Sequence, residues 1–205
     1  MVPGMSSTRG FGDQLRIIGG RWRGRRLSFP PLAELRPTPD RVRETLFNWL
    51  APVIEGARCL DLFAGSGALG VEALSRGAAE VVFIERHPAA ARRLQDNLRL
   101  LGVASFRVKQ VDALIWLEGP AQPFDIVFLD PPFGGNRLGP ACAALEGRGW
   151  LAPIAHLYLE SSPQAKPPLP DNWRIVREKT AGQVTYRLAV RHPEILLALP
   201  QGLPA

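Results

Sequence analysis

The stretch CLDLFAGSGALGVEAL, residues 59–74, sets a glycine-rich loop between a strand-like run and a helix-like run. Within it, Gly65 to Gly70 reads G-x-G-x-x-G, and glycines at such a turn let a ligand approach the N-terminus of the helix. Outward from this stretch, strand-like and helix-like runs alternate along residues 57–63, 68–77, 80–85, 88–102, 105–110, 113–117 and 124–130. Alternation at this spacing predicts βαβ units and a doubly wound, mostly parallel α/β sheet.

Further strand-like runs follow Pro153, at residues 155–160, 173–179 and 184–190. Only residues 180–183 separate the last two runs, which is too short for the crossover that a parallel pair needs. We therefore predict an antiparallel C-terminal hairpin at the edge of the sheet.

The excess positive charge lies at the N-terminus. Of the net charge of +6, all is accounted for by residues 1–43, because the acidic and basic residues after Arg43 balance. The runs Leu15 to Ile18 and Arg25 to Phe29 predict a basic hairpin, and clustered arginines favour a nucleic-acid partner. We predict RNA contacts by Arg16, Arg21, Trp22, Arg23, Arg25, Arg26, Arg36, Arg41 and Arg43. For Trp22, stacking on a base and packing of the hairpin onto the sheet both remain open.

A helix is predicted after this hairpin, in TPDRVRETLFNWLAP, residues 38–52. Thr38 is expected as its N-cap and Pro39 at its first position. We divide the chain into a disordered tail (1–14), an RNA-binding extension (15–52), a catalytic domain (53–191) and a C-terminal tail (192–205). The two cysteines are too few for a disulfide framework, which favours the cytoplasm, and the histidines are scattered, so we expect no metal. No apolar run is long enough to span a membrane, so we expect no membrane partner, and we expect a monomer.

Carboxylates stand at the ends of the first strands of the predicted sheet, where α/β proteins bind ligands. Asp61 would oppose a pyrophosphate but can hold the ammonium group of S-adenosylmethionine, so we favour that cofactor over NAD. Glu85 can accept hydrogen bonds from the ribose, and Asp112 with the Ala113 amide can contact adenine. An exposed acid and a helix N-cap are the alternatives for Glu85 and Asp112. The predicted cofactor residues are Asp61, Phe63, Ala64, Gly65, Gly67, Glu85, Arg86, Asp112 and Ala113.

The apolar run FDIVFL, residues 124–129, ends on Asp-Pro-Pro-Phe, residues 130–133. An exocyclic amine of a nucleobase is a poor nucleophile, and it can be oriented if the Asp130 carboxylate and the Pro131 carbonyl accept its N–H groups. Pro132 would stiffen the turn, and Phe133 can stack on the base. The alternative is that these residues form only a rigid exit from the strand.

The blocks RIIGGRWRGRRL, LRPTPDRVRETLFNWL, DLFAGSGALGVEALSRGA, DPPF and EKTAGQVTYRL together resemble the bacterial family of small-subunit rRNA guanine-N2 methyltransferases, methyltransferase D. The resemblance covers residues 15–190. It implies a Rossmann-like class I methyltransferase with a seven-stranded sheet, which methylates N2 of one guanine in 16S rRNA within the assembled or assembling 30S subunit. It also assigns Asp130 to Phe133 to the catalytic motif.

Other functions stay open from sequence alone. The same kind of proline motif is used for amino-methylation of DNA bases or of a protein glutamine. The arginine arm favours nucleic acid over protein, and the lack of a base-recognition domain argues against a sequence-specific DNA enzyme. A non-catalytic ribosome-assembly factor with this fold is a further alternative. The intact glycine loop and DPPF motif argue against it.

Overall fold

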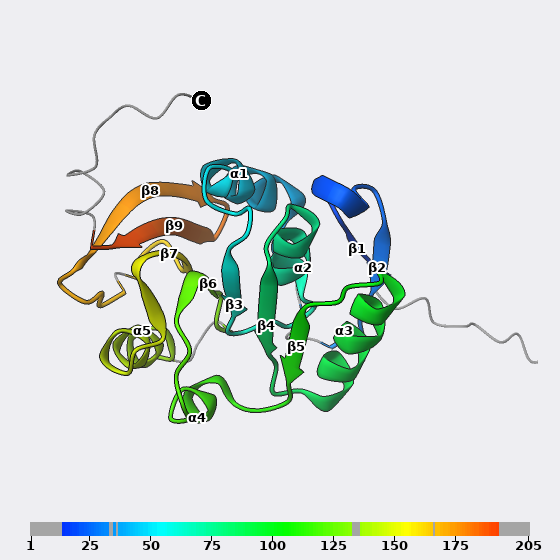
Figure 1. The fold of residues 1–205 in the computed structure, drawn as a ribbon. Helices are drawn as coiled ribbons and strands as arrows, with labels where there is room; N and C mark the ends of the chain where they lie inside the picture. The colour runs from blue at the N-terminus through cyan, green and yellow to red at the C-terminus, as the bar shows by residue number, and fades with distance from the viewer. Residues whose placement is uncertain (1–13, 33–34, 36, 133–135, 166, 193–205) are drawn as a thin grey trace, which may run out of the picture.

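The computed structural model describes residues 14–32, 35, 37–132, 136–165 and 167–192. The main strands are β3 (Arg58–Asp61), β4 (Glu80–Ile84), β5 (Phe106–Lys109), β6 (Phe124–Leu129), β7 (Leu151–Ser161), β8 (Trp173–Ala181) and β9 (Val184–Arg191). They form one seven-stranded sheet in the order β5-β4-β3-β6-β7-β9-β8 (Figure 1). The first five strands of that order are parallel, and β9 and β8 add an antiparallel hairpin at the edge. The predicted fold class is confirmed.

Helices cover both faces of the sheet (Figure 1). One face carries α1 (Asp40–Leu50), α2 (Ala68–Ser75) and α3 (Pro88–Leu100), and the other carries α4 (Ala113–Trp116) and α5 (Leu138–Gly147). Helix α5 was not predicted from the sequence. Its buried residues Leu138, Ala141, Cys142 and Leu145 have helical spacing, but Pro140 within its first turn hides the pattern.

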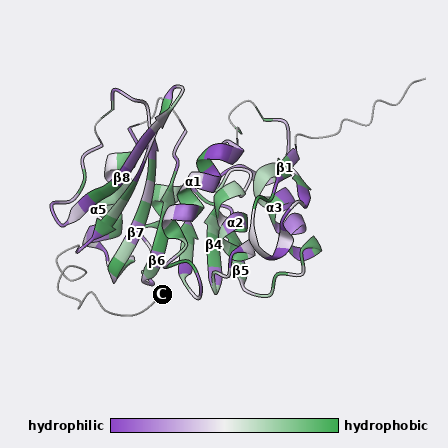
Figure 2. Ribbon diagram, turned by 90° about the horizontal axis from the view of Figure 1, so that it is seen from above, coloured by the Kyte–Doolittle hydropathy of each residue, from purple (hydrophilic) through white to green (hydrophobic). Residues whose placement is uncertain are grey.

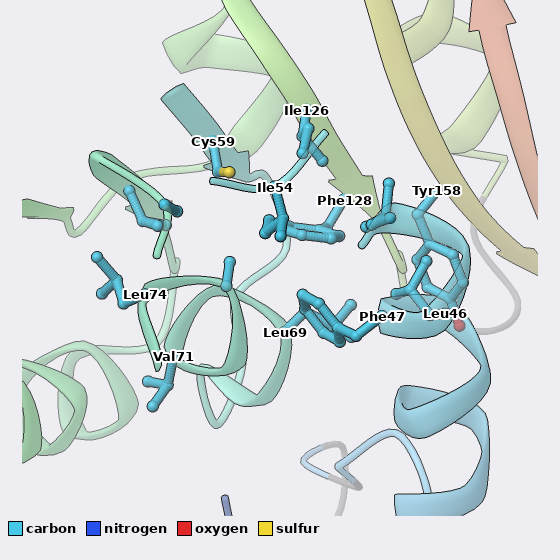
Figure 3. Packing of buried hydrophobic residues seen from close by; sticks show 14 of the residues in the cluster. Leu46, Phe47, Ile54, Cys59, Leu69, Val71, Leu74, Ile126, Phe128 and Tyr158 are labelled. Atoms are coloured by element: carbon cyan, nitrogen blue, oxygen red, sulfur yellow. The ribbon is translucent and has the colours of Figure 1, made fainter. Parts of the chain in front are cut away.

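Apolar side chains fill the space between the sheet and these helices, and Figure 2 shows the hydrophobic residues along the central strands β4 and β6. On the α1 side, Phe47 meets Phe128 with ring centroids 5.9 Å apart (Figure 3). Trp49 stacks on Tyr186 of β9 at 5.5 Å. Because its buried face joins the main core, α1 is part of the body of the protein.

The predicted N-terminal hairpin is present, with shorter strands than expected. Antiparallel strands β1 (Gln14–Arg16) and β2 (Arg26–Ser28) flank a single 3-10 turn, η1 (Gly20–Trp22). Trp22 is buried in the main core, and its amide donates to the Ser75 hydroxyl at 3.0 Å. Of the two interpretations of Trp22, packing of the hairpin onto the body is therefore the one the structure supports.

A buried carboxylate on α2 fastens the hairpin and α1 to the body. Glu72 is fully buried and accepts hydrogen bonds from the amides of Ile18 (2.9 Å) and Gly19 (2.7 Å) and from Arg76 Nε (2.8 Å). Arg43 of α1 lies 3.5 Å from the same carboxylate. One acid thus neutralises basic side chains and satisfies backbone donors from a distant segment.

Arg43 itself is only 1% exposed. Its guanidinium donates to the carbonyl groups of Arg16 (2.8 Å) and Thr38 (3.1 Å) and to the Asp40 carboxylate (2.6 Å). The prediction that Arg43 contacts RNA is wrong, because its donors are used inside the protein.

The start of α1 also differs from the prediction. Helix α1 begins at Asp40, Pro39 occupies the N-cap position, and no side chain caps it. Thr38 lies one residue earlier and is buried. The prediction of Thr38 as the N-cap is therefore wrong, and its side chain has other neighbours, described below.

The sheet ends in β8, whose residues from Arg174 to Ala181 are exposed. Its pairing with β9 shifts register between Ile175 and Arg177. Among the described residues, no helix is long and apolar enough to cross a membrane.

Replacing Glu72 by Ala should lower the free energy of unfolding by about 3–5 kcal/mol, because the buried Arg43 guanidinium and two amides lose their acceptor. Urea denaturation followed by circular dichroism measures this loss. Glu118→Ala, at an exposed carboxylate, is the matched control and should change little. A loss below about 1 kcal/mol for Glu72→Ala would mean that the Glu72 contacts contribute little to holding the hairpin on the body.

Candidate active site

The carboxyl ends of β3, β4 and β6 meet at one edge of the sheet, because these strands are parallel neighbours. Asp61 ends β3, Glu85 follows β4 and Asp130 follows β6. The N-terminus of α2 reaches the same edge through the glycine loop. The structure thus brings the predicted cofactor loop and the predicted catalytic motif together.

The glycine loop has a backbone that other residues would strain. Gly67 has φ = 80°, and a Cβ there would lie 2.3 Å from Leu94 Cδ1 of α3. A side chain at Gly67 would therefore push α3 away as well as strain the turn. The loop is also tied to the sheet, since the Ala64 amide donates to the Ile84 carbonyl at 2.9 Å.

Asp61 is nearly buried beneath this loop. Its Oδ2 accepts a hydrogen bond from the Gly70 amide at 2.9 Å, within the first turn of α2. Burial raises the pKa of Asp61 to about 7, the negative charge of Glu85 adds to the rise, and the Gly70 hydrogen bond opposes it. Such a carboxylate gains from a neighbouring cation.

Glu85 is also buried, so the alternative of an ordinary exposed acid is excluded. Its carboxylate accepts from the Gly65 amide at 2.8 Å and from the His87 amide at 2.6 Å. These contacts fix the glycine loop against the end of β4. Each carboxylate oxygen can accept a further hydrogen bond beside the one it has.

Asp112 serves as the N-cap of α4, accepting from the Leu114 amide at 2.9 Å. Its other oxygen forms an ion pair with Arg137, whose guanidinium also lies over the Phe63 ring at 5.9 Å. Partial burial raises the pKa of Asp112, but the hydrogen bonds from Arg137 and Leu114 outweigh this and lower it. Arg137 was not among the predicted site residues, because a lone arginine in the segment FGGNRL carries no sequence signal.

Asp130 is half-buried at the end of β6, and Pro131 is buried behind it. Burial raises the pKa of Asp130 well above its usual range, as do the negative charges of Glu160 and Asp61. A hydrogen bond from Thr38 acts in the opposite direction. Pro132 is exposed, while Phe133 and Arg36 lie outside the described residues.

Glu160 of β7 is a member of this edge that the sequence analysis missed. It is 5% exposed and accepts a hydrogen bond from the Tyr158 hydroxyl at 2.6 Å. The available signal was its position, since Glu160 ends an apolar run as Asp61 and Asp130 do.

A cavity of about 340 Å³ lies between the hairpin and the segment that leads into α1. Its lining includes Arg16, Phe29, Leu35, Thr38 and Arg43. Leu35 reaches the glycine loop, where a Cβ on Gly65 would lie 2.9 Å from Leu35 Cδ2. The extension therefore covers part of the predicted cofactor site.

The remaining predicted RNA contacts are at the surface: Arg16, Arg21, Arg23, Arg25, Arg26 and Arg41 are all exposed. Ala113 is buried at the start of α4, and Arg86 is exposed after β4. Within the described ranges, no group of three or more His, Cys, Asp or Glu side chains could hold a metal ion.

Comparison with known proteins gives consistent matches over most of the chain. Residues 15–190 match the family described as conserved hypothetical protein 95. The Escherichia coli K12 protein named ribosomal RNA small subunit methyltransferase D is 52% identical over 182 residues, 88% of this chain and 92% of the relative. The Haemophilus influenzae protein of the same name is 47% identical, covering 85% of this chain and 93% of the relative.

Solved structures agree with the sequence relatives. A putative methyltransferase from Escherichia coli, yhhF, superposes with a TM-score of 0.83 and 50% identity, covering 87% of this chain and 98% of that one. The fold is therefore that of a class I methyltransferase. Because the family match spans most of the chain and these two relatives, at 52% and 47% identity, cover 88% and 85% of it, this chain belongs to the ribosomal RNA small subunit methyltransferase D family.

Proposed function

We propose that this protein transfers a methyl group from S-adenosylmethionine to the exocyclic N2 amine of one guanine in 16S rRNA, in the assembled or assembling 30S subunit. The observation that carries the proposal is the position of Asp130, at the same sheet edge as the Asp61 and Glu85 carboxylates. The names of the relatives support the substrate class.

The residues at the glycine loop fit S-adenosylmethionine. The buried Asp61 carboxylate, whose pKa is raised to about 7, favours a cationic group such as the ammonium of the methionine part. Glu85 has acceptor capacity left for ribose hydroxyls, and the loop glycines leave room for the ligand beside the backbone. When bound, S-adenosylmethionine supplies an electrophilic methyl group. Asp61 is also why we disfavour a dinucleotide, whose pyrophosphate it would repel.

Asp130 and Pro131 are suited to an amine substrate. The Asp130 carboxylate and the Pro131 carbonyl accept one N–H each, so the nitrogen lone pair is directed at the methyl group. Pro131 is buried and fixed, which sets the acceptor positions before the substrate arrives. We keep Phe133, which lies outside the described residues, as a proposed stacking partner of the base.

The exposed arginines of the hairpin support an RNA substrate over a protein glutamine. Arg21, Arg23, Arg25 and Arg26 stand on one short segment whose Trp22 and backbone are anchored to the body. A rigidly held cluster of cations binds phosphates without large ordering costs. Residues suited to the cofactor and acceptors suited to an amine lie at the same sheet edge. We therefore favour an enzyme over a non-catalytic ribosome-assembly factor.

Binding of S-adenosylmethionine should weaken as the pH falls below about 7, by up to about tenfold per pH unit, because Asp61 binds the ligand cation only when ionised. Calorimetry at pH 6.0 and 7.5 measures this. Asp61→Asn, which keeps an oxygen acceptor for the Gly70 amide, should bind more weakly at pH 7.5 and lose the pH dependence. Equal pH dependence in both proteins would remove Asp61 from the ammonium site.

Replacing Asp130 by Ala should reduce methyl transfer by at least about a hundredfold while leaving S-adenosylmethionine affinity nearly intact, because Asp130 serves the amine. Labelled methyl transfer to 30S particles, naked 16S rRNA and DNA, followed by nucleoside analysis, measures this and tests the proposed function. N2-methylguanine from the ribosomal substrates is expected. Label in DNA alone, or wild-type rates in the mutant, would refute the assignment.

Replacing Arg21, Arg23, Arg25 and Arg26 by Ala should weaken binding to the ribosomal substrate and reduce the log–log salt slope by roughly 0.7–0.9 for each lost phosphate contact. The matched control removes the same charge elsewhere, by Ala at the exposed Arg92, Arg93, Arg99 and Arg148. Affinity is measured at several salt concentrations. If both variants behave alike, net charge and not the hairpin governs binding.

A further inference from the structure

The ends of β6 and β7 bring a second carboxylate to Asp130. These strands are parallel, with Leu129 opposite Leu159. Continuing this register by one residue sets Asp130 beside Glu160 on the face that carries Phe128 and Tyr158, since side chains alternate along a strand. Phe128 and Tyr158 themselves meet edge to face, with ring centroids 6.5 Å apart. Both side chains are labelled in Figure 3.

Hydroxyl groups hold this carboxylate pair from two directions. Tyr158, which is fully buried, donates to Glu160 Oε1 at 2.6 Å. From the extension, the buried Thr38 hydroxyl lies near both carboxyls and lowers the pKa of each, since its single hydrogen can be donated to either one. Thr38 is in turn fixed by Arg43 Nε, which donates to its carbonyl at 3.1 Å. The pair therefore has defined partners on the sheet and on the segment before α1.

The surroundings of the pair favour holding a proton. Burial raises the pKa of Asp130 and of Glu160, and the charge of Glu160 raises that of Asp130 further. Asp61 from β3 acts in the same direction, and Tyr186 of β9 lies opposite Glu160 in register. No basic side chain is among the described groups that shift either pKa. Burial also raises the pKa of Tyr158, which stays protonated and donates to Glu160.

We propose that Glu160 is a positioning residue for methyl transfer: its carboxylate stands beside that of Asp130, so that the pair takes up the proton that the substrate amine must lose. Thr38 and Tyr158 hold the pair in place. This inference rests on the proposed function, and it assigns a role to residues that the DPPF motif does not contain.

Methyl transfer leaves the amine nitrogen with one proton to lose. The N2 lone pair bonds to the methyl carbon while the carbon–sulfur bond breaks and leaves its electrons on sulfur, so the sulfonium becomes a neutral thioether. The amine nitrogen gains the positive charge and releases one N–H proton to Asp130. The ionised pair then holds one shared proton, which it loses to water before the next turnover. Because two adjacent carboxylates repel, the first proton binds more tightly than it would to Asp130 alone.

Replacing Glu160 by Gln tests this role through the pH dependence of the single-turnover rate on 30S particles. In the wild type, the rate should rise with pH as the pair loses its shared proton. In Glu160→Gln, Asp130 loses its charged neighbour, so this rise should move to lower pH by about one unit or more, and the plateau rate above the rise should fall about threefold or more, because a less basic carboxylate accepts the proton less well. The exposed Glu118→Gln should follow the wild type.

Thr38 provides an independent variant if Glu160→Gln is unstable. Thr38→Val removes a hydrogen bond that lowers the pKa of both carboxyls, so the rise should move to higher pH, and Thr38→Ser should restore it. A loss of rate in Glu160→Gln and Thr38→Val with an unmoved pH profile would overturn the proposal, because a purely structural role predicts that result. Absence of N2-methylguanine from the wild type would instead refute the proposed function.

Discussion

The fully buried carboxylate of Glu72 is the interaction on which the arrangement of the molecule depends. It lies on α2, the helix that begins at the glycine loop, and it binds both the hairpin backbone and Arg43 of α1. Arg43 in turn binds the carbonyl of Thr38, whose side chain meets Asp130. A single chain of contacts thus runs from the basic hairpin, past the helix of the cofactor loop, to the end of β6.

This chain of contacts changes how the N-terminal extension is understood. Its exposed arginines are suited to RNA, yet Trp22, Arg43 and Thr38 lie inside the protein. The extension also lines a cavity of its own and reaches the glycine loop through Leu35. The N-terminal extension therefore contributes residues to the candidate site, in addition to its exposed arginines.

The sequence was sufficient for the elements whose signal is local. Strand and helix alternation, the glycine loop and the short link before β9 each depend on neighbouring residues, so the sheet and its edge hairpin could be predicted. The burial of Arg43 and Thr38 could not be predicted. An arginine in the first turn of a helix, or a threonine before a proline, has the same sequence pattern whether its side chain is exposed or buried. Glu160 was missed for a related reason: its closeness to Asp130 depends on the register of β6 and β7.

The exposed strand β8 has a consequence for how the protein behaves at high concentration. A long edge strand normally offers its free backbone groups to a strand of another molecule, which leads to aggregation. Here the register shift near Val176 interrupts the regular ladder, and charged side chains such as Glu178 and Lys179 occupy the strand. An irregular strand that carries charged side chains is one of the features by which β-proteins disfavour pairing between exposed sheet edges.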